Sequence, residues 1–171
     1  MDCIYKSSTT KSPVTSPSPS PSMALHIDSF TFHVAGADLK STAKRYTSRF
    51  GSRGGLTLLF THCVGSHKEQ WEPTIEQIFH LQQRKDQRDR IREAWAFDWQ
   101  SHGDAAVINA RALDSRRDAV SPVEWALALE TFIKSHLRGH RIVALGHSAG
   151  TSAMLVYLVL QCQQAQVTSA P

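Results

Sequence analysis

The chain has 171 residues, of which 41% are hydrophobic and 20% are charged, and its formal net charge is +4. This length suffices for one ordinary domain, and the composition from about residue 24 onward is that of a globular protein. The main concentration of charge, residues 84–92, mixes both signs without interleaved aromatic residues, which argues against nucleic-acid binding and favours a solvated connection between two elements.

Cysteine and histidine spacing argue against a disulfide framework and a metal site. Cys3, Cys63 and Cys162 are odd in number and widely spaced, which favours a reducing, intracellular compartment. None of the nine histidines stands in a ligand-spaced motif, so we predict no metal and no cofactor. The longest apolar run, residues 153–160, is too short to span a bilayer, so we expect no transmembrane segment.

Residues 1–23 are rich in serine, threonine and proline, and we expect them to form a disordered tail. Alternating prolines in residues 16–22 remove backbone donors, and the segment offers almost no apolar area to bury. It has no apolar stretch of the kind that a signal peptide requires. Met1 and Met23 both stay open as the start of the protein, and we predict one partial domain over residues 24–171.

Two β-rich stretches open the globular part. Residues 29–35 and 41–48 predict an antiparallel pair joined through residues 36–38. Residues 56–61 form a continuous apolar run, which is typical of a buried parallel strand. The strand breaks at His62, and we expect this side chain to order the following loop through hydrogen bonds and not to act as a base.

A helix and a second buried parallel strand follow. Residues 73–83 predict the helix, because Ile75, Ile78 and Phe79 share one face at helical spacing. The apolar residues 94–97 predict the strand. Alternation of strands and helices in this way gives a mostly parallel sheet covered by helices, an α/β fold.

The next helix carries a clear start signal. Ser121 is the expected N-cap, Pro122 occupies the first helical position, and Glu124 completes a capping box. Gly139 is expected to end the helix. Its apolar stripe, for which we predict core packing, consists of Trp125, Leu129, Phe132 and Ile133.

The most informative motif is residues 146–150, GHSAG, which follow a third buried strand at residues 141–145 and open a helix-forming stretch at residues 151–164. A serine between a strand and a helix, with glycines two residues to either side, matches the G-x-S-x-G nucleophile elbow. The turn is so tight that the backbone of the serine is strained. We therefore predict Ser148 as a nucleophile.

The motif also assigns roles to its neighbours. Gly146 and Gly150 are expected where strand and helix approach too closely for a side chain. We expect His147 to be turned away from the oxyanion hole and to act as a packing residue.

Three segments in this order resemble the N-terminal part of an α/β-hydrolase: residues 61–73 (THCVGSHKEQWEP), residues 95–104 (WAFDWQSHGD) and the elbow. The closer resemblance is to fungal hydrolases of the AK-toxin biosynthesis type and to their peroxisomal lipase-like relatives. It covers roughly residues 25–152. Cys63 departs from the pattern, because the broader fold usually has glycine there.

The resemblance implies an oxyanion hole and an activity. In α/β-hydrolases one donor lies in the loop after the first parallel strand, and the other is the residue after the nucleophile; here these are the backbone N–H groups of Val64 and Ala149. The implied activity is hydrolysis of a small-molecule acyl ester or thioester in fungal secondary-metabolite or toxin biosynthesis. The implied place is the cytoplasm or the peroxisome, although residues 169–171 are not a tripeptide of the S-K-L kind.

The usual partners of the serine do not follow it. In this fold an Asp or Glu and then a His come after the nucleophile, whereas residues 151–171 contain none of these. We therefore expect a fold truncated after the elbow helix, and a catalytically inactive, truncated or mis-spliced fragment stays open as an alternative. Asp98 and His102 lie on the same sheet edge as Ser148 and are conceivable substitutes. We favour an ordinary loop that shapes the entrance, because triads are defined by geometry.

Overall fold

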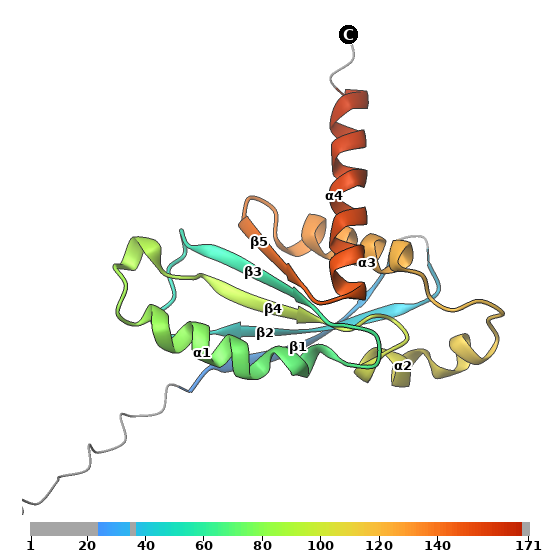
Figure 1. Cartoon of the computed structure of the whole chain (residues 1–171), viewed down its shortest axis with the longest axis horizontal. Coiled ribbons are helices and arrows are strands. Elements are labelled where there is room, and N and C mark those ends of the chain that lie inside the picture. The colour runs from blue at the N-terminus through green and yellow to red at the C-terminus, as the bar shows by residue number, and fades with distance from the viewer. Residues whose placement is uncertain (1–23, 35–36, 169–171) are drawn as a thin grey trace, which may run out of the picture.

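The computed structural model describes residues 24–34 and 37–168 (Figure 1). The predictions for the tail at residues 1–23, for the alternative starts at Met1 and Met23, and for the tripeptide at residues 169–171 lie outside the described residues. The connection predicted at residues 36–38 lies partly outside them.

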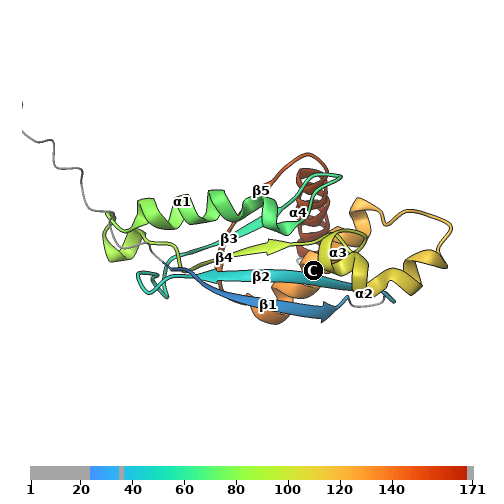
Figure 2. The same ribbon diagram turned by 90° about the horizontal axis from the view of Figure 1, so that it is seen from below.

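A five-stranded sheet forms the centre of the molecule, with β1 and β5 at opposite edges (Figure 2). Its first two strands pair antiparallel, as expected, and β2 also pairs antiparallel with β4. Strand β3 pairs parallel with both β4 and β5. In spatial order the strands are β1 (His26–His33), β2 (Lys40–Thr47), β4 (Glu93–Phe97), β3 (Leu56–Thr61) and β5 (Arg141–Gly146).

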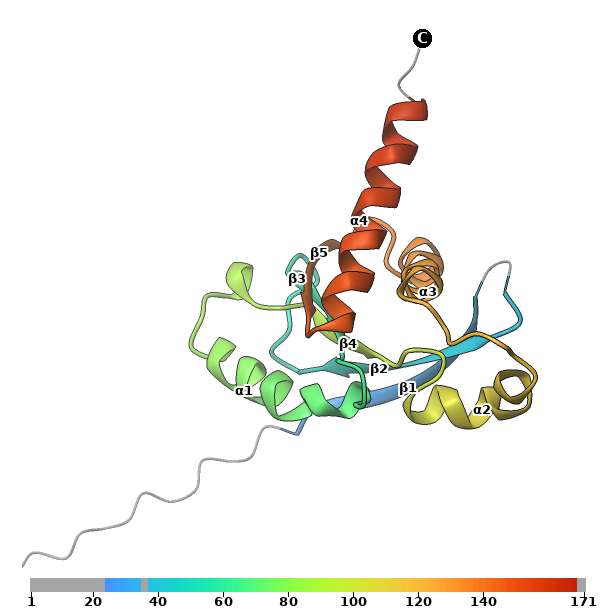
Figure 3. The same cartoon turned by 45° about the vertical axis from the view of Figure 1, so that its right-hand side comes forward.

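Within the described ranges, three α-helices and two short 3₁₀ helices lie between these strands, and α4 follows the last one. Figure 3 shows α1 on one side of the sheet and α3 and α4 on the other. The helices are η1 (Lys68–Trp71), α1 (Glu72–Gln82), η2 (Gln87–Asp89), α2 (Gly103–Asp114), α3 (Pro122–His136) and α4 (Ala149–Thr168).

Alternate residues of β3 face the two sides of the sheet, and this divides the core in two. Leu58 and Phe60 pack with Ile75 and Phe79 of α1, whereas Leu59 packs on the side of α3. A continuous apolar strand is therefore covered by helices on both faces, which is the arrangement that the sequence predicted.

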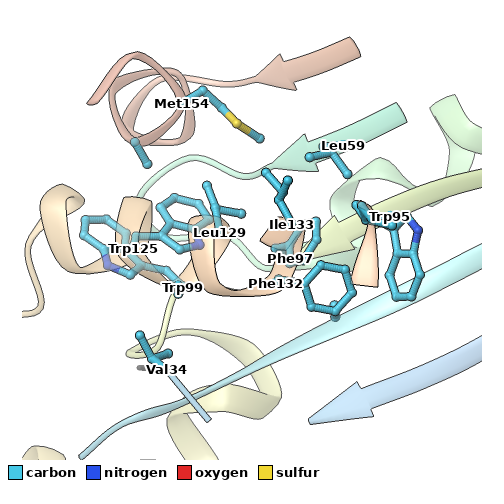
Figure 4. Packing of buried hydrophobic residues seen from close by; sticks show 14 of the residues in the cluster. Val34, Leu59, Trp95, Phe97, Trp99, Trp125, Leu129, Phe132, Ile133 and Met154 are labelled. Carbon is cyan, nitrogen blue, oxygen red and sulfur yellow. The ribbon is translucent and has the colours of Figure 1, made fainter. Parts of the chain in front are cut away.

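Helix α3 packs into the larger of the two core clusters (Figure 4). Its predicted capping box is confirmed, because the hydroxyl of Ser121 accepts from the N–H of Glu124, and the carboxylate of Glu124 accepts from the N–H of Ser121 at 2.8 Å. The predicted stripe is confirmed as well. Trp125 and Phe132 are fully buried, and the ring of Phe132 packs against Trp95 and Phe97 of β4.

Two features of the fold differ from the sequence predictions. Strand β5 is not buried: it is an edge strand in the described part of the chain, and Val143 is 40% exposed. Helix α2 was not predicted, because it buries only Ala105 and Asn109 and thus lacks an apolar stripe. The amide of Asn109 fixes this helix to β2 through hydrogen bonds to the N–H and the carbonyl of Lys40.

Helix α4 extends beyond the sheet (Figure 1). Its first turns pack on α3 through Ala153 and Met154, which are buried. Farther along, the side chain of Gln161 donates to Glu130 of α3 at 2.8 Å. Tyr157 packs against the core as well, whereas Leu155 and Leu158 are each more than half exposed.

Candidate active site

Ser148 has a strained backbone at the junction of β5 and α4. Its φ of 53° lies in the left-handed region, and no other non-glycine residue of the described ranges has a positive φ. A serine in this conformation stores strain that the surrounding structure must offset. The carbonyl of Ser148 accepts from the N–H groups of Thr151 and Ser152, which begin the helix directly behind the turn. The side chain of Ser148 is exposed.

Both glycines of the motif stand where a side chain has no room. A Cβ at Gly146 would lie 2.6 Å from the backbone nitrogen of Thr151, and a Cβ at Gly150 would lie 2.6 Å from the carbonyl oxygen of Thr61. Real Cβ atoms essentially never approach backbone atoms so closely. The glycines therefore let the start of α4 lie directly against the loop that follows β3.

The loops after β3 and β5 begin side by side. Thr61 lies opposite Gly146 in the parallel register, and the N–H of His147 donates to the carbonyl of Thr61 at 3.0 Å. Val64 and Ala149 each lie three residues beyond this pair. Within the described residues, neither of their N–H groups has a hydrogen-bond acceptor. Two unpaired amides, one in the loop after β3 and one at the first residue of α4, are the donors that an oxyanion hole requires.

His62 is fully buried and bonded at both ring nitrogens. Its Nε2 accepts from the N–H of Trp99 at 3.1 Å, which leaves the proton on Nδ1, 2.8 Å from the carbonyl oxygen of Cys63. Burial lowers the pKa of this imidazole, although the hydrogen bond to the Cys63 carbonyl and the Asp98 carboxylate act in the opposite direction. A neutral ring engaged on both sides is suited to hold a loop and not to deprotonate a serine.

The geometry does not favour Asp98 and His102 as substitute catalytic partners. Asp98 is fully buried and its carboxylate accepts from Thr42 and from the backbone N–H of Lys68, each at 2.8 Å. The ring of His102 stacks on Trp99 with centroids 5.2 Å apart. In the described chain, no side chain forms a hydrogen bond with the hydroxyl of Ser148.

The expectation that His147 is a packing residue is wrong. Its side chain is exposed beside Ser148. The physical reason is that it leaves the edge strand β5, on whose outer side no further strand of the described ranges pairs. Its backbone N–H, bonded to Thr61, is what ties the turn to β3.

A buried ion pair beside the site was not predicted from the sequence. The ammonium group of Lys68 is 2.8 Å from Asp98 and 2.7 Å from Asp104, and the Lys68 side chain is only 1% exposed. One sequence signal was available: Asp98 directly follows a fully buried strand, and a carboxylate in such a place requires a compensating partner.

A neighbouring carboxylate predicts acid sensitivity. Although burial raises the pKa of Glu69, hydrogen bonds from His67, Lys68 and Lys44 outweigh it and lower the value from 4.5 to about 2. Because the folded pKa is depressed, the stabilisation is complete above pH 4.5 and is lost as the pH falls towards 2. We expect the free energy of unfolding to fall in this window, and Glu69→Gln to flatten the fall in a urea titration.

Glu76→Gln, on the exposed face of α1, is the matched control and should leave the pH profile unchanged. If Glu69→Gln and the unaltered chain had parallel profiles between pH 4.5 and 2, the ion pairs of Glu69 would not stabilise the fold.

The described part of the chain offers neither a metal-binding cluster nor a membrane-spanning helix. No group of three or more His, Cys, Asp or Glu residues is arranged to hold a metal ion there. No helix of residues 24–34 and 37–168 has both the length and the apolar character needed to cross a membrane.

Solved structures with similar folds include hydrolases of 14–22% sequence identity. The peroxisomal alpha-beta-hydrolase Lpx1 of Saccharomyces cerevisiae has a TM-score of 0.61 and 22% identity over 83% of this chain and 41% of its own. A hyperthermophilic esterase from Pyrobaculum calidifontis has a TM-score of 0.55 and 14% identity over 84% of this chain and 41% of its own. A cold-adapted esterase from an Arctic intertidal metagenomic library has a TM-score of 0.51 and 20% identity over 82% of this chain and 57% of its own.

The chain thus spans about 41% of the length of the first two of these proteins. A comparison with curated protein sequences finds no match. The family model described as the alpha/beta hydrolase family matches residues 58–170, which is more than half of the chain and includes most of β3, the elbow and α4. The strained serine between β5 and α4 and the parallel strands beside it agree with this match. The chain therefore belongs to the alpha/beta hydrolase family.

Proposed function

We propose that this chain carries the nucleophile and the oxyanion hole of a serine hydrolase that cleaves ester or thioester bonds. The observation that carries the proposal is the left-handed φ of Ser148, with the unpaired N–H groups of Val64 and Ala149 on adjoining loops. A strained, exposed serine next to two free amides is what acyl transfer requires.

The reaction would proceed through an acyl-enzyme. A base takes the proton of the Ser148 hydroxyl, and Oγ attacks the acyl carbonyl carbon. The carbonyl oxygen becomes negative and accepts from the N–H groups of Val64 and Ala149. Collapse of this intermediate expels the alcohol or thiol, which takes up the proton, and water then releases the acid from Ser148. His62 would hold the loop of Val64.

The base and its carboxylate are not supplied by a side chain bonded to Ser148 in the described residues. Because the chain spans about 41% of the length of similar hydrolases, we propose that a longer form of the protein provides both. The three segments that resemble fungal toxin-biosynthesis hydrolases support a small acyl ester or thioester of fungal secondary metabolism as the substrate, and the cytoplasm or peroxisome as the place of action.

A second candidate is a catalytically inactive chain. Two observations favour it: the Ser148 hydroxyl has no hydrogen-bond partner in the described part, and no Asp, Glu or His occurs in residues 151–171. Without a base, a serine hydroxyl is a weak nucleophile. The elbow would then remain as a structural feature only.

Labelling with a fluorophosphonate probe separates these candidates. We expect a longer form of the protein, which supplies the base, to be labelled and its Ser148→Ala variant to lose all labelling, because the probe reacts with an activated serine hydroxyl. Ser152→Ala is the matched control, since Ser152 is an exposed serine one turn along α4 and should be labelled like the unaltered chain.

Equal labelling of the unaltered chain and Ser148→Ala would refute Ser148 as the nucleophile. Absence of labelling in all three proteins would support the inactive candidate. The longer form is expressed from a transcript that encodes a downstream Asp or Glu and a His.

A further inference from the structure

The loop that carries Val64 is held at its start by His62. The buried imidazole bonds forward to the carbonyl of Cys63 and sideways to the N–H of Trp99, which follows the neighbouring strand β4. The ring also packs against Trp125 of α3, with centroids 4.9 Å apart. This first anchor fixes the point at which the chain leaves the sheet.

The same loop is held at its end by Lys68. The backbone N–H of Lys68 donates to Oδ1 of Asp98 at 2.8 Å, and its Nζ donates to Oδ2 of the same carboxylate at 2.8 Å. A single side chain on the end of β4 therefore binds one loop residue through both main chain and side chain. Nζ also donates to Asp104 of α2 at 2.7 Å.

This second anchor is fully buried and its hydrogen-bonding capacity is satisfied. Asp98 is 0% exposed and accepts two further hydrogen bonds, from Thr42 of β2 and from the N–H of Asp104. Burial alone lowers the pKa of Lys68, but its hydrogen bonds to Asp104, Asp98 and Glu69 outweigh this and raise the pKa, so the ammonium group stays charged. Gly103 allows the close approach, because a Cβ there would lie 2.5 Å from the Asp98 carboxylate.

Fewer contacts hold the residues between the anchors: the thiol of Cys63 donates to the side chain of Gln70 at 3.6 Å, and the ring of His67 bonds to Glu69 at 2.7 Å. Val64 is 64% exposed, and Gly65 has a φ of 79°. One turn bond, from the N–H of Ser66 to the carbonyl of Cys63 at 3.3 Å, is the backbone hydrogen bond that closes the loop. The direction of the Val64 N–H thus depends on where the two anchors place the chain.

We propose that Lys68 and Asp98 are positioning residues that orient the Val64 N–H towards the oxyanion. This deepens the proposed function and rests on it. The two residues do not touch the reacting atoms; they act by fixing the end of the loop that carries the donor. Preorganised donors accelerate a reaction because they need no reorientation when the charge develops.

The test compares three variants of the full chain. Lys68→Met removes the ammonium group but leaves the backbone N–H. Lys68→Met with Asp98→Asn also removes the unpaired charge, while the Asn carbonyl can still accept from that N–H. Lys44→Met is the matched control, because Lys44 pairs with Glu69 and Glu72 in the same network but does not bond to Asp98.

The first measurement is the NMR order parameter of the Val64 amide, which does not depend on catalysis. We expect about 0.85 in the unaltered chain and in Lys44→Met, and below about 0.6 in Lys68→Met. The double variant should recover part of the loss. The second measurement is the rate at which a fluorophosphonate labels the longer form that supplies the base. We expect this rate to fall about tenfold to a hundredfold in Lys68→Met and to recover partly in the double variant, as the order parameter does.

Each outcome decides the proposal. An unchanged Val64 order parameter in folded Lys68→Met, or an equal loss in Lys44→Met, would overturn it. If Lys68→Met does not fold, the double variant takes its place. We then expect a Val64 order parameter between about 0.6 and about 0.85, and an unchanged value would overturn the proposal. Failure of the proposed function would give a different result, because the unaltered protein would then show no labelling that depends on Ser148. The Val64 order parameters would still show whether Lys68 and Asp98 hold the loop.

Discussion

Gly150→Ala is expected to destabilise the fold by about 3 kcal/mol, because the new methyl group would overpack a closely packed contact. Its Cβ would lie 2.6 Å from the carbonyl oxygen of Thr61 and 2.7 Å from that of His62. Neither atom belongs to a flexible side chain, so α4 would have to move away from the loop of Val64. Urea unfolding followed by circular dichroism measures the loss.

Whether Gly150→Ala lowers or raises the free energy of unfolding shows whether the methyl group meets a steric conflict. At a helical position without a steric conflict, Gly→Ala stabilises by about 0.5–1 kcal/mol. Gly54→Ala is the matched control, because a Cβ at Gly54 would meet nothing within 4 Å, and we expect it to be neutral or stabilising by about 0.4–1 kcal/mol. If Gly150→Ala were as stable as Gly54→Ala, the start of α4 would not lie as close to the end of β3 as the structure places it.

Trp125→Ala is expected to cost about 3–5 kcal/mol, the usual range for removing a large buried aromatic side chain. Trp125 is 0% exposed and stacks on Trp99 with an interplanar angle of 6° and centroids 5.1 Å apart. Its indole N–H has no hydrogen-bond partner in the described structure. The loss would therefore come from packing and from the cavity left beside His62.

Leu127→Ala is the control for this prediction. Leu127 lies two residues along the same helix and is 39% exposed, so its truncation should change the free energy of unfolding by no more than about 0.5–1 kcal/mol. Circular dichroism is the appropriate signal for both variants, because the substitution at Trp125 also alters the fluorescence. Equal stabilities would show that α3 does not pack on the sheet through Trp125.

Trp125 also connects the core to the candidate site. Its ring packs against His62, which bonds to the N–H of Trp99. We expect Trp125→Ala to loosen the first anchor of the loop as well as the core. Fluorophosphonate labelling of the folded fraction should therefore decrease, whereas Leu127→Ala should be labelled like the unaltered chain.

Elements with a strong local signal were predicted closely from the sequence. Strand β3 has the predicted bounds, and α3 begins at the predicted capping box, because side-chain and backbone groups only three residues apart determine that start. The turn at Ser148 was predicted from two glycines and their flanking strand and helix, and the left-handed φ agrees with it. Its catalytic role stays a prediction.

Features that depend on distant residues were not predicted. Helix α2 is held by Asn109, whose partner Lys40 is 69 positions away in the chain. The pairing of Lys68 with Asp98 joins residues 30 positions apart. No local pattern distinguishes such a lysine from an exposed one, because its burial arises only when β4, η1 and α2 meet.

The sequence by itself determined the strands and the helices α1, α3 and α4, the cap of α3 and the tight turn at Ser148. Each of these follows from the conformational preferences of residues that are close in the chain. Only the tertiary structure decided that β5 is exposed, that His62 is bonded at both ring nitrogens and that Asp98 holds Lys68. Those properties depend on which groups lose their water and which partners replace it, and both are fixed when distant segments pack together.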